Sequence, residues 1–244
     1  MQLIESVPTN WKKNILDDRG LSKNLCFFES HLIKNTQIYV INRLNSKELY
    51  SIQNYCCTSK STSQIYFESL FQTTLNWKEI CMIPRKAASD TFTRNFQYKI
   101  LNNILYLNKM LFIFKKVNSP LCSFCKSEDE TPLHLFFSCT ITQNLWNQLK
   151  TVCGHKLTIP DLTSQSAIFG FFDSNIRFEN LVNHLLLIFK LYLYSAREST
   201  RINIEGLKAK IVKIKEIEKN IANVSTQKHK KFCRKWDVVK DIFN

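Results

Sequence analysis

The 244-residue sequence predicts a mainly α-helical protein, an irregular helical assembly with one small Cys-Cys-His-Cys module stapled by zinc. Only four glycines and five prolines are present, whereas an all-β sandwich or barrel needs many tight turns built from these residues. Apolar residues recur at spacings of three and four over several long segments, which is the period of an amphipathic helix. A Cys-x-x-Cys pair followed by a histidine and a third cysteine predicts the metal module.

Composition and pattern divide the chain into three predicted segments. Residues 1–84 form a helical linker region, 85–152 a basic helix plus the zinc module, and 153–244 a helical region with a basic tail. In the first segment, Asn45 or Ser46 is a candidate N-cap for a short helix. The loop-like run CTSKSTS at residues 57–63 indicates a hinge.

In the middle segment, Ser89 and Asp90 provide a helix start. One apolar stripe then follows at helical spacing: Phe92, Phe96, Ile100, Leu101, Ile104 and Leu105. Residues 111–117 are predicted to form a second short helix. Its Phe112 and Phe114 have the chemistry to stack on bases, but packing in the core is the preferred interpretation.

Three helices are predicted after the metal motif. Residues 140–152 should turn Leu145 and Trp146 inward, and residues 178–196 are apolar nearly all round, which is typical of a central buried helix. Residues 204–221 predict an amphipathic helix that packs on the body of the protein. Its apolar stripe comprises Leu207, Ile211, Ile214, Ile217 and Ile221.

Two segments carry nearly all of the formal net charge of +14. Residues 85–116 hold seven basic residues against Asp90 alone, and residues 201–244 hold twelve against five acidic ones. Such concentration can attract a polyanion, although lysine-rich helices also present ordinary solvated faces. The candidate nucleic-acid contacts are Arg94, Lys99, Lys109, Lys115, Lys116, Lys228, Lys230, Lys231, Arg234 and Lys235.

The cysteines and the apolar runs indicate an intracellular protein. The nine cysteines are odd in number and unevenly spaced, and residues 1–16 lack the order of a signal peptide. The longest apolar run, residues 185–194, is too short to span a bilayer. We therefore expect no membrane partner and no small-molecule substrate. The expected location is the nucleus or a cytoplasmic ribonucleoprotein, and the basic run KHKKFCRK could direct nuclear import.

The metal motif comprises Cys122, Cys125, His134 and Cys139. Both thiolates of a Cys-x-x-Cys turn can face one ion, and the later histidine and cysteine complete a tetrahedron. Because four protein ligands leave no position for a catalytic water, the spacing predicts a structural Zn²⁺ on which local folding depends. The alternatives are four unliganded side chains, or substitution of one ligand by His155, which lies beside Cys153.

The stretch around this motif closely resembles the zinc-binding segment behind the reverse transcriptase of LINE-type non-LTR retrotransposons. The matching residues are Phe96, Lys99, Ile100, Leu101, Asn118, Ser119, Pro120, Leu121, the pair Glu130 and Thr131, the run HLFF at 134–137, Cys139 and Trp146. The resemblance extends weakly to Leu49 and Tyr50, to residues 168–170, and to Lys235 and Trp236. It implies that residues 1–84 follow a polymerase domain, and that the chain is a truncated or fragmentary C-terminal piece.

The resemblance implies binding of element RNA or target DNA, with an upstream reverse transcriptase domain as a further partner. No Tyr-x-Asp-Asp pattern is present, so we expect no polymerase activity and no enzymatic activity of the chain itself. One alternative is a protein-docking scaffold that presents the apolar stripe of residues 204–221. Another is a degenerate restriction-like endonuclease at Asp161 and Asp173, but no Asp/Glu-x-Lys triplet follows Asp161.

Overall fold

The computed structural model describes residues 31–34, 37–40, 45–47, 60–172 and 176–243. The chain forms two compact units, Met1–Lys60 and Ser61–Asn244. Both boundaries between the predicted segments, after residues 84 and 152, fall inside the second unit. None of the described helices has the length and apolar character required to cross a membrane.

The first unit contains a β-hairpin where only helices were predicted. Strands β1 (His31–Lys34) and β2 (Gln37–Val40) pair antiparallel, with His31 opposite Val40. Their β-branched and aromatic residues favour strands, and the two-residue separation is typical of a hairpin. Residues 46–47 are helical, which agrees with an N-cap at Asn45, and the positions predicted to follow lie outside the described residues.

The described residues of the second unit form helices joined by loops and carry the Cys-Cys-His-Cys group, so the predicted mainly helical fold class is confirmed. It begins with α4 (Thr62–Phe71) and α5 (Trp77–Ala87). The Ser61 side chain accepts a hydrogen bond from the Gln64 N–H and forms a capping box. Helix α4 therefore begins at Thr62, before the end of the loop predicted for residues 57–63. Phe67 packs edge to face against Phe169 with ring centroids 5.3 Å apart, anchoring α4 on the core.

Helix α6 (Thr91–Leu101) begins at Asp90, as predicted, because the Asp90 side chain accepts a hydrogen bond from the Thr93 N–H. Its buried stripe is narrower than expected, since Phe92 and Ile104 are exposed. Helix α7 (Asn108–Ile113) begins three residues before the predicted segment. The prediction that Phe112 and Phe114 pack in the core is wrong, because both rings are exposed.

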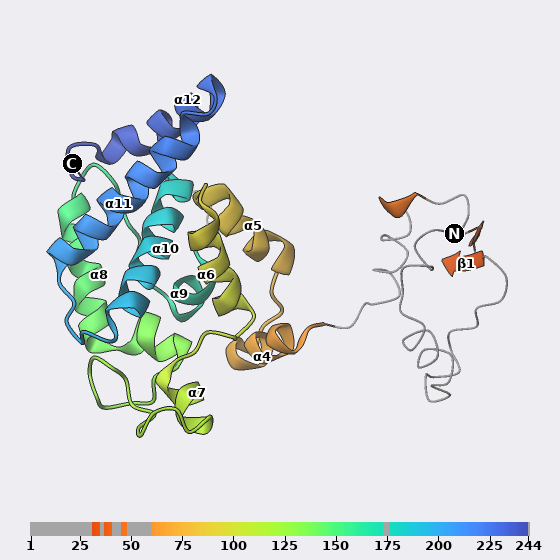
Figure 1. The fold of residues 1–244 in the computed structure, drawn as a ribbon, viewed down its shortest axis with the longest axis horizontal. Helices are drawn as coiled ribbons and strands as arrows, with labels where there is room; N and C mark the ends of the chain where they lie inside the picture. Colours follow the sequence, from red (N-terminus) through yellow and green to blue (C-terminus); the bar gives the residue numbers. More distant parts are fainter. Residues whose placement is uncertain (1–30, 35–36, 41–44, 48–59, 173–175, 244) are drawn as a thin grey trace, which may run out of the picture. The chain divides into compact units, whose positions relative to one another are not determined.

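Helix α10 (Glu179–Ala196) lies at the centre of the second unit, as its apolar composition predicted. It contacts α5 and α6, and also the amphipathic helix α11 (Ile204–Ala222) (Figure 1). Helices α8 (Thr140–Cys153) and α9 (Ser164–Phe169) complete the core, and Leu145 and Trp146 of α8 point inward as expected. Helix α10 is therefore the element on which helices that precede it and helices that follow it in the sequence both pack.

Lys190 is the polar exception within α10. Its side chain is fully buried, and its Nζ atom donates hydrogen bonds to Gln97 Oε1 at 2.7 Å and to the Ile168 carbonyl at 3.2 Å. Burial lowers the pKa of Lys190 to about 7. These two acceptors satisfy the amine and connect α10 to α6 and α9.

Helices α11 and α12 (Thr226–Trp236) form a hairpin that packs against α10. Leu207, Ile211 and Ile214 are buried, whereas Ile217 is exposed. The predicted packing of this helix on the body is therefore confirmed for most of the stripe. A short 3-10 turn, Asp237–Val239, follows α12.

Candidate metal centre

The Cys-x-x-Cys half of the motif lies in a tight backbone turn. The Cys122 N–H donates to the Glu128 carbonyl at 2.7 Å, and the Lys126 N–H donates to the Cys122 carbonyl at 3.1 Å. Lys126 adopts a left-handed conformation with φ of 57°. Reversal of the chain at this residue lets Cys122 and Cys125 present their sulfurs to the same side.

The His134 half of the motif uses a π-helical turn, His134–Ser138, that leads directly into α8. The Cys139 N–H donates to the His134 carbonyl at 2.9 Å, which closes this wider turn. Cys139 then forms the N-cap of α8. The positive end of the helix dipole at this position favours the thiolate form of cysteine.

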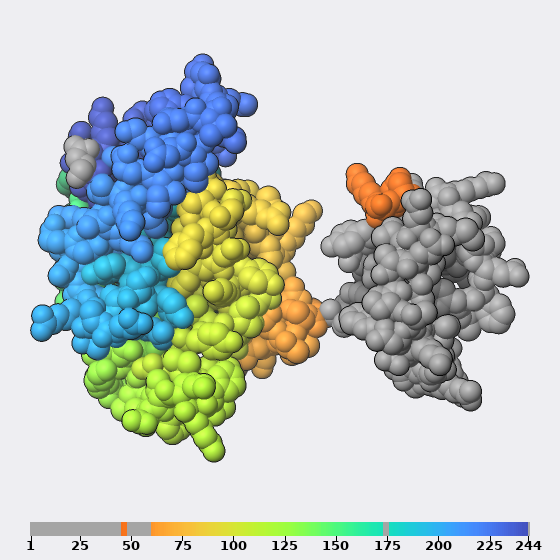
Figure 2. Space-filling model, in the orientation of Figure 1, coloured from red at the N-terminus to blue at the C-terminus, as the bar shows by residue number. Residues whose placement is uncertain are grey.

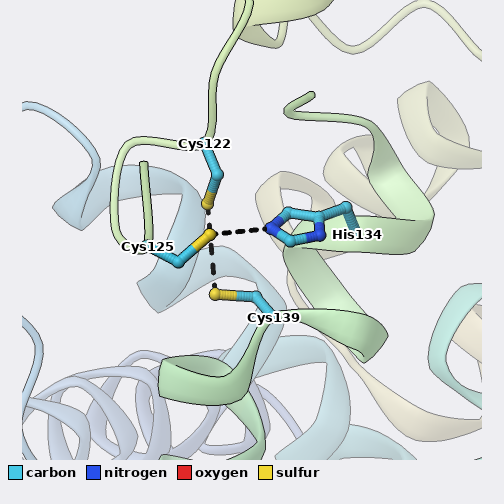
Figure 3. A group of neighbouring side chains, drawn as sticks. All are labelled: Cys122, Cys125, His134 and Cys139. Atoms are coloured by element: carbon cyan, nitrogen blue, oxygen red, sulfur yellow. Dashed lines mark hydrogen bonds between the residues drawn. The ribbon is translucent and has the colours of Figure 1, made fainter. Parts of the chain in front are cut away.

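The four predicted ligands come together, and their donor atoms all lie within 4.8 Å of one another. The Sγ atoms of Cys122 and Cys139 are 4.0 Å apart, and Cys125 Sγ lies 3.2 Å from His134 Nε2. A tetrahedral zinc site with ordinary bond lengths would separate such atoms by about 3.5–3.8 Å. Figure 3 shows the three sulfurs and the imidazole pointing toward a common centre, so this group could hold one metal ion.

The protonation of these side chains reflects their crowding. The sulfur contact between Cys122 and Cys139 lowers the pKa of Cys139 to about 4 and raises the pKa of Cys122. Burial by itself would lower the pKa of His134, but the neighbouring Cys125 thiol reverses the direction and raises it. The close sulfurs therefore differ in how readily they lose a proton, and a divalent cation that binds such a group displaces protons from it.

The histidine is oriented by a carboxylate outside the ligand set. His134 Nδ1 lies 3.1 Å from Glu128 Oε2 and 3.1 Å from Ser138 Oγ. With Nδ1 donating to these oxygens, the lone pair of Nε2 points at the thiols, which is the tautomer that a metal ligand requires. The sequence reasoning missed this role of Glu128, for which its place in the loop between the ligand pairs was the only signal.

Glu130 ends the acidic stretch between the two ligand pairs, and its side chain is fully buried. It accepts hydrogen bonds from the Ser123 N–H at 2.7 Å, the Asn108 N–H at 3.1 Å and Arg197 Nη1 at 2.6 Å. Although burial alone would raise the pKa of Glu130, these donors and the Arg197 charge lower it. The carboxylate joins α7, the cysteine turn and the end of α10.

Other candidate ligands do not join the cluster. His155 is exposed and Cys153 is buried in the apolar core, and neither belongs to the four-residue group. Among the described residues a second set of donor atoms, from Asp90, His184 and Glu218, also lies within 4.8 Å. There the Lys235 ammonium already contacts Glu218 Oε2 at 2.8 Å, so an ion pair within the chain accounts for this carboxylate.

The structure sorts the ten basic candidates by their surroundings. Lys109 forms an ion pair with Asp129 at 3.2 Å, Arg94 donates to the carbonyls of Ser89 and Asp90, and Lys235 is mostly buried. The remaining candidates are exposed: Lys99, Lys115, Lys116, Lys228, Lys230, Lys231 and Arg234. Figure 2 shows that the surface formed by residues 99–116 and the surface formed by α12 belong to different parts of the second unit.

Residues 58–146 match the family model described as zinc-binding in reverse transcriptase. The matched range contains α4, α5, α6, α7 and all four residues of the cluster. Neither the curated proteins nor the solved structures contain a match to the chain. The family and the cluster together support a zinc-binding module similar to that of reverse transcriptases.

Proposed function

We propose that this protein is a non-catalytic, zinc-dependent nucleic-acid-binding module, derived from the C-terminal segment of a LINE-type retrotransposon reverse transcriptase. The observation that carries the proposal is the exposed aromatic end of α7, a helix whose first residue is hydrogen-bonded to the turn that carries Cys122 and Cys125. We call residues 112–116, which comprise Phe112, Ile113, Phe114, Lys115 and Lys116, the α7 tip.

The α7 tip exposes more apolar surface than a solvated helix end requires. Phe112 is 46 %, Ile113 61 % and Phe114 49 % exposed, and Tyr106 packs edge to face on Phe114 with centroids 6.3 Å apart. Aromatic faces next to lysines are the usual means by which proteins bind single-stranded nucleic acid, with bases stacked on the rings and phosphates near the ammonium groups. Single-stranded RNA or DNA is therefore the proposed ligand.

Hydrogen bonds connect the start of α7 to the turn that carries Cys122 and Cys125. The Asn108 N–H at the start of α7 donates to Glu130, and Asn108 Nδ2 donates to the Leu121 carbonyl at 2.8 Å. Glu130 and Leu121 belong to the turn that carries Cys122 and Cys125. A bound zinc would hold this turn and, through it, the tip. The zinc itself would have no catalytic role, because four protein ligands complete its coordination.

The alternatives have less support. A docking scaffold was expected to use the stripe of α11, but Leu207, Ile211 and Ile214 are buried within the chain. In the nuclease alternative, Asp161 forms an ion pair with Lys150, and Asp173 lies outside the described residues. The family match to reverse transcriptases, which handle both RNA and DNA strands, is consistent with nucleic acid as the partner.

Fluorescence anisotropy with a labelled single-stranded RNA, measured at two salt concentrations, tests the proposal. Since stacking contributes roughly 1–3 kcal/mol per base, Phe112→Ala/Phe114→Ala should weaken binding at least tenfold. Phe92→Ala, which removes an exposed ring from α6, is the matched control and should change the affinity less than twofold. Undetectable binding by the unmodified chain, or equal affinity of the double variant and the control, would contradict the proposal.

A further inference from the structure

A basic hollow of about 250 Å³ lies between the junction of α5 and α6 and the face of α12. We call it the basic pocket. One carboxylate, Glu218, also borders it. Its six cationic side chains are Arg85, Lys86, Arg94, Lys228, Lys231 and Lys235.

The two sides of the basic pocket come from segments more than a hundred residues apart, and Glu218 joins them. Its Oε1 accepts a hydrogen bond from the Ser89 N–H, and its Oε2 accepts from Lys235 Nζ at 2.8 Å and Trp236 Nε1 at 3.0 Å. Lys235 Nζ also donates to the Ala87 carbonyl. These bonds fix α12 beside the α5–α6 junction.

Small and large apolar side chains line the hollow between the basic residues. Ala87, Ala88 and Ala222 are small and buried, and Ile221 and Phe232 are the larger ones. The volume is below the range of about 300–1,000 Å³ usual for small-molecule and cofactor sites. A group as small as a phosphate, entering from an open strand, fits the hollow better than a complete nucleotide cofactor does.

The positive charge of the basic pocket is not neutralised from within. Lys235 is the ion-pair partner of Glu218, and among the described residues no carboxylate forms an ion pair with Arg85, Lys86, Lys228 or Lys231. Four such cations around one hollow repel one another, and an anion that enters between them relieves this repulsion.

Two backbone carbonyls hold the guanidinium of Arg94, which borders the basic pocket. Its Nε atom donates to the Asp90 carbonyl at 3.1 Å, and its Nη2 atom donates to the Ser89 carbonyl at 3.0 Å. A guanidinium fixed in this way loses little conformational entropy when a further acceptor arrives. Lys228, Lys230, Lys231 and Arg234 border an adjoining hollow, so the basic surface continues along α12.

We infer that the basic pocket binds a backbone phosphate of the nucleic acid, as a contact separate from the α7 tip. The assignment of the phosphate to a nucleic acid rests on the proposed function. In Figure 1, α7 and α12 lie at opposite ends of the second unit. One strand that contacts both places would bind more tightly than through either place alone, because the second contact forms within the complex.

The salt dependence of RNA binding by the full chain tests the inference. Lys228→Gln/Lys231→Gln should weaken RNA binding about tenfold and lower the slope of log affinity against log salt by about one to two. Lys78→Gln/Lys213→Gln removes the same charge from exposed positions that do not border the pocket, and should leave the slope unchanged. If the unmodified chain binds RNA and the two double variants behave alike, the inference is wrong while the proposed function stands.

Lysine acetylation read by mass spectrometry separates the remaining outcomes, with RNA and inorganic tripolyphosphate as probes. RNA should protect Lys228 and Lys231 more strongly than Lys213. Protection by tripolyphosphate but not by RNA would assign the pocket to small polyphosphates and overturn the inference. Failure of the unmodified chain to bind RNA at all would overturn the proposed function. Equal acetylation of all three lysines with either probe would also overturn the assignment of the basic pocket as a phosphate site.

Discussion

The two ring nitrogens of His134 face different groups, with Nε2 3.2 Å from Cys125 Sγ and Nδ1 3.1 Å from both Glu128 Oε2 and Ser138 Oγ. A carboxylate behind a histidine ligand fixes the ring orientation and raises its basicity, and loss of such a partner costs about 10–100-fold in metal affinity. Glu128 is thus a positioning residue for the metal, although it contributes no ligand atom.

Glu128→Gln should weaken zinc binding by about tenfold or more, because the neutral amide is a poorer acceptor for the Nδ1 proton. Competition with a chromophoric chelator measures this change. Asp129→Asn is the matched control, since Asp129 contacts Lys109 rather than the histidine. Equal zinc affinities of the two variants would remove Glu128 from the metal centre.

Glu130→Gln should lower the free energy of unfolding by about 3 kcal/mol, because it leaves the partly buried Arg197 without its counter-charge. Urea denaturation of the zinc-loaded chain measures the change. Glu198→Gln, an exposed neighbour of Arg197, should alter the stability by less than about 0.5 kcal/mol. A loss of stability no larger than that of the control would show that Glu130 does not stabilise the contact between α7, the cysteine turn and the end of α10.

Single-residue roles were only partly predictable from the sequence. The spacing of Cys122, Cys125, His134 and Cys139 predicted one cluster because cysteines and histidines at such intervals in the sequence are typical of zinc ligands. The burial of Glu130 could not be predicted from its neighbours in the sequence. Its partners Asn108 and Arg197 lie on either side of it in sequence, and no local pattern connects them.

At the scale of elements, α10 and α12 meet around His184, which is fully buried and packs edge to face on Trp236 with centroids 5.4 Å apart. Its two ring nitrogens have no hydrogen-bond partner within the described chain. Burial, reinforced by the Lys235 charge, lowers the pKa of His184 to about 3. The folded chain therefore keeps this imidazole neutral well below its ordinary pKa.

The packing of α10 on α12 should make stability depend on pH. Below about pH 6.5 the unfolded chain takes up a proton on His184 that the folded chain refuses, so the stability falls by about 1.4 kcal/mol per pH unit toward pH 3. His184→Phe, which keeps a ring against Trp236, should show a shallower slope between pH 6.5 and 5. His155→Gln, at an exposed position, should keep the slope of the unmodified chain. Parallel slopes in all three proteins would contradict the prediction.

Elements with long regular periodicity were predictable, whereas short elements were not. Helices α8, α10 and α11 follow their apolar patterns because each buries one face, or nearly its whole surface, in the core. Strands β1 and β2 have four residues each, too few to separate a strand from a helical turn by period. The burial of the aromatic residues at the end of α7 was predicted wrongly, because their type is typical of a core although they face solvent.

On the scale of the second unit, the metal centre lies at one side of a core that has its own apolar packing. Helices α8, α9, α10 and α11 bury a continuous cluster in which residues such as Leu149, Ile168 and Phe189 are fully enclosed. The cysteine turn contributes only Cys122 and Phe124 to this cluster, and α7 has no buried residue. Metal binding should therefore stabilise this region more than the core.

Chelation of zinc should increase hydrogen exchange mainly in residues 108–131, while α10 and α11 stay protected by their own burial. Exchange measured by mass spectrometry, with and without chelator, checks this. Cys139→Ser should reproduce the effect of the chelator, whereas Cys81→Ser, at an exposed cysteine outside the cluster, should not. Uniform exposure of the whole unit after chelation would show that the core itself depends on the metal.

The basic pocket could not be predicted from the sequence. The two basic segments were visible as charge, but the pattern of one helix carries no information about a partner more than a hundred residues away. Their meeting depends on the hydrogen bond of Ser89 to Glu218 and on that of Lys235 to Ala87, which are contacts of the folded chain alone.

Zinc-dependent binding of nucleic acid is tested most directly by the RNA affinity of the full chain with zinc bound and after its removal. The zinc-loaded chain should bind single-stranded RNA at least tenfold more tightly than the stripped chain, and added Zn²⁺ should restore the affinity. The Cys139→Ser variant should remain weak after Zn²⁺ is added. Equal affinity with and without zinc would contradict a metal-dependent function, even if the cluster binds the ion.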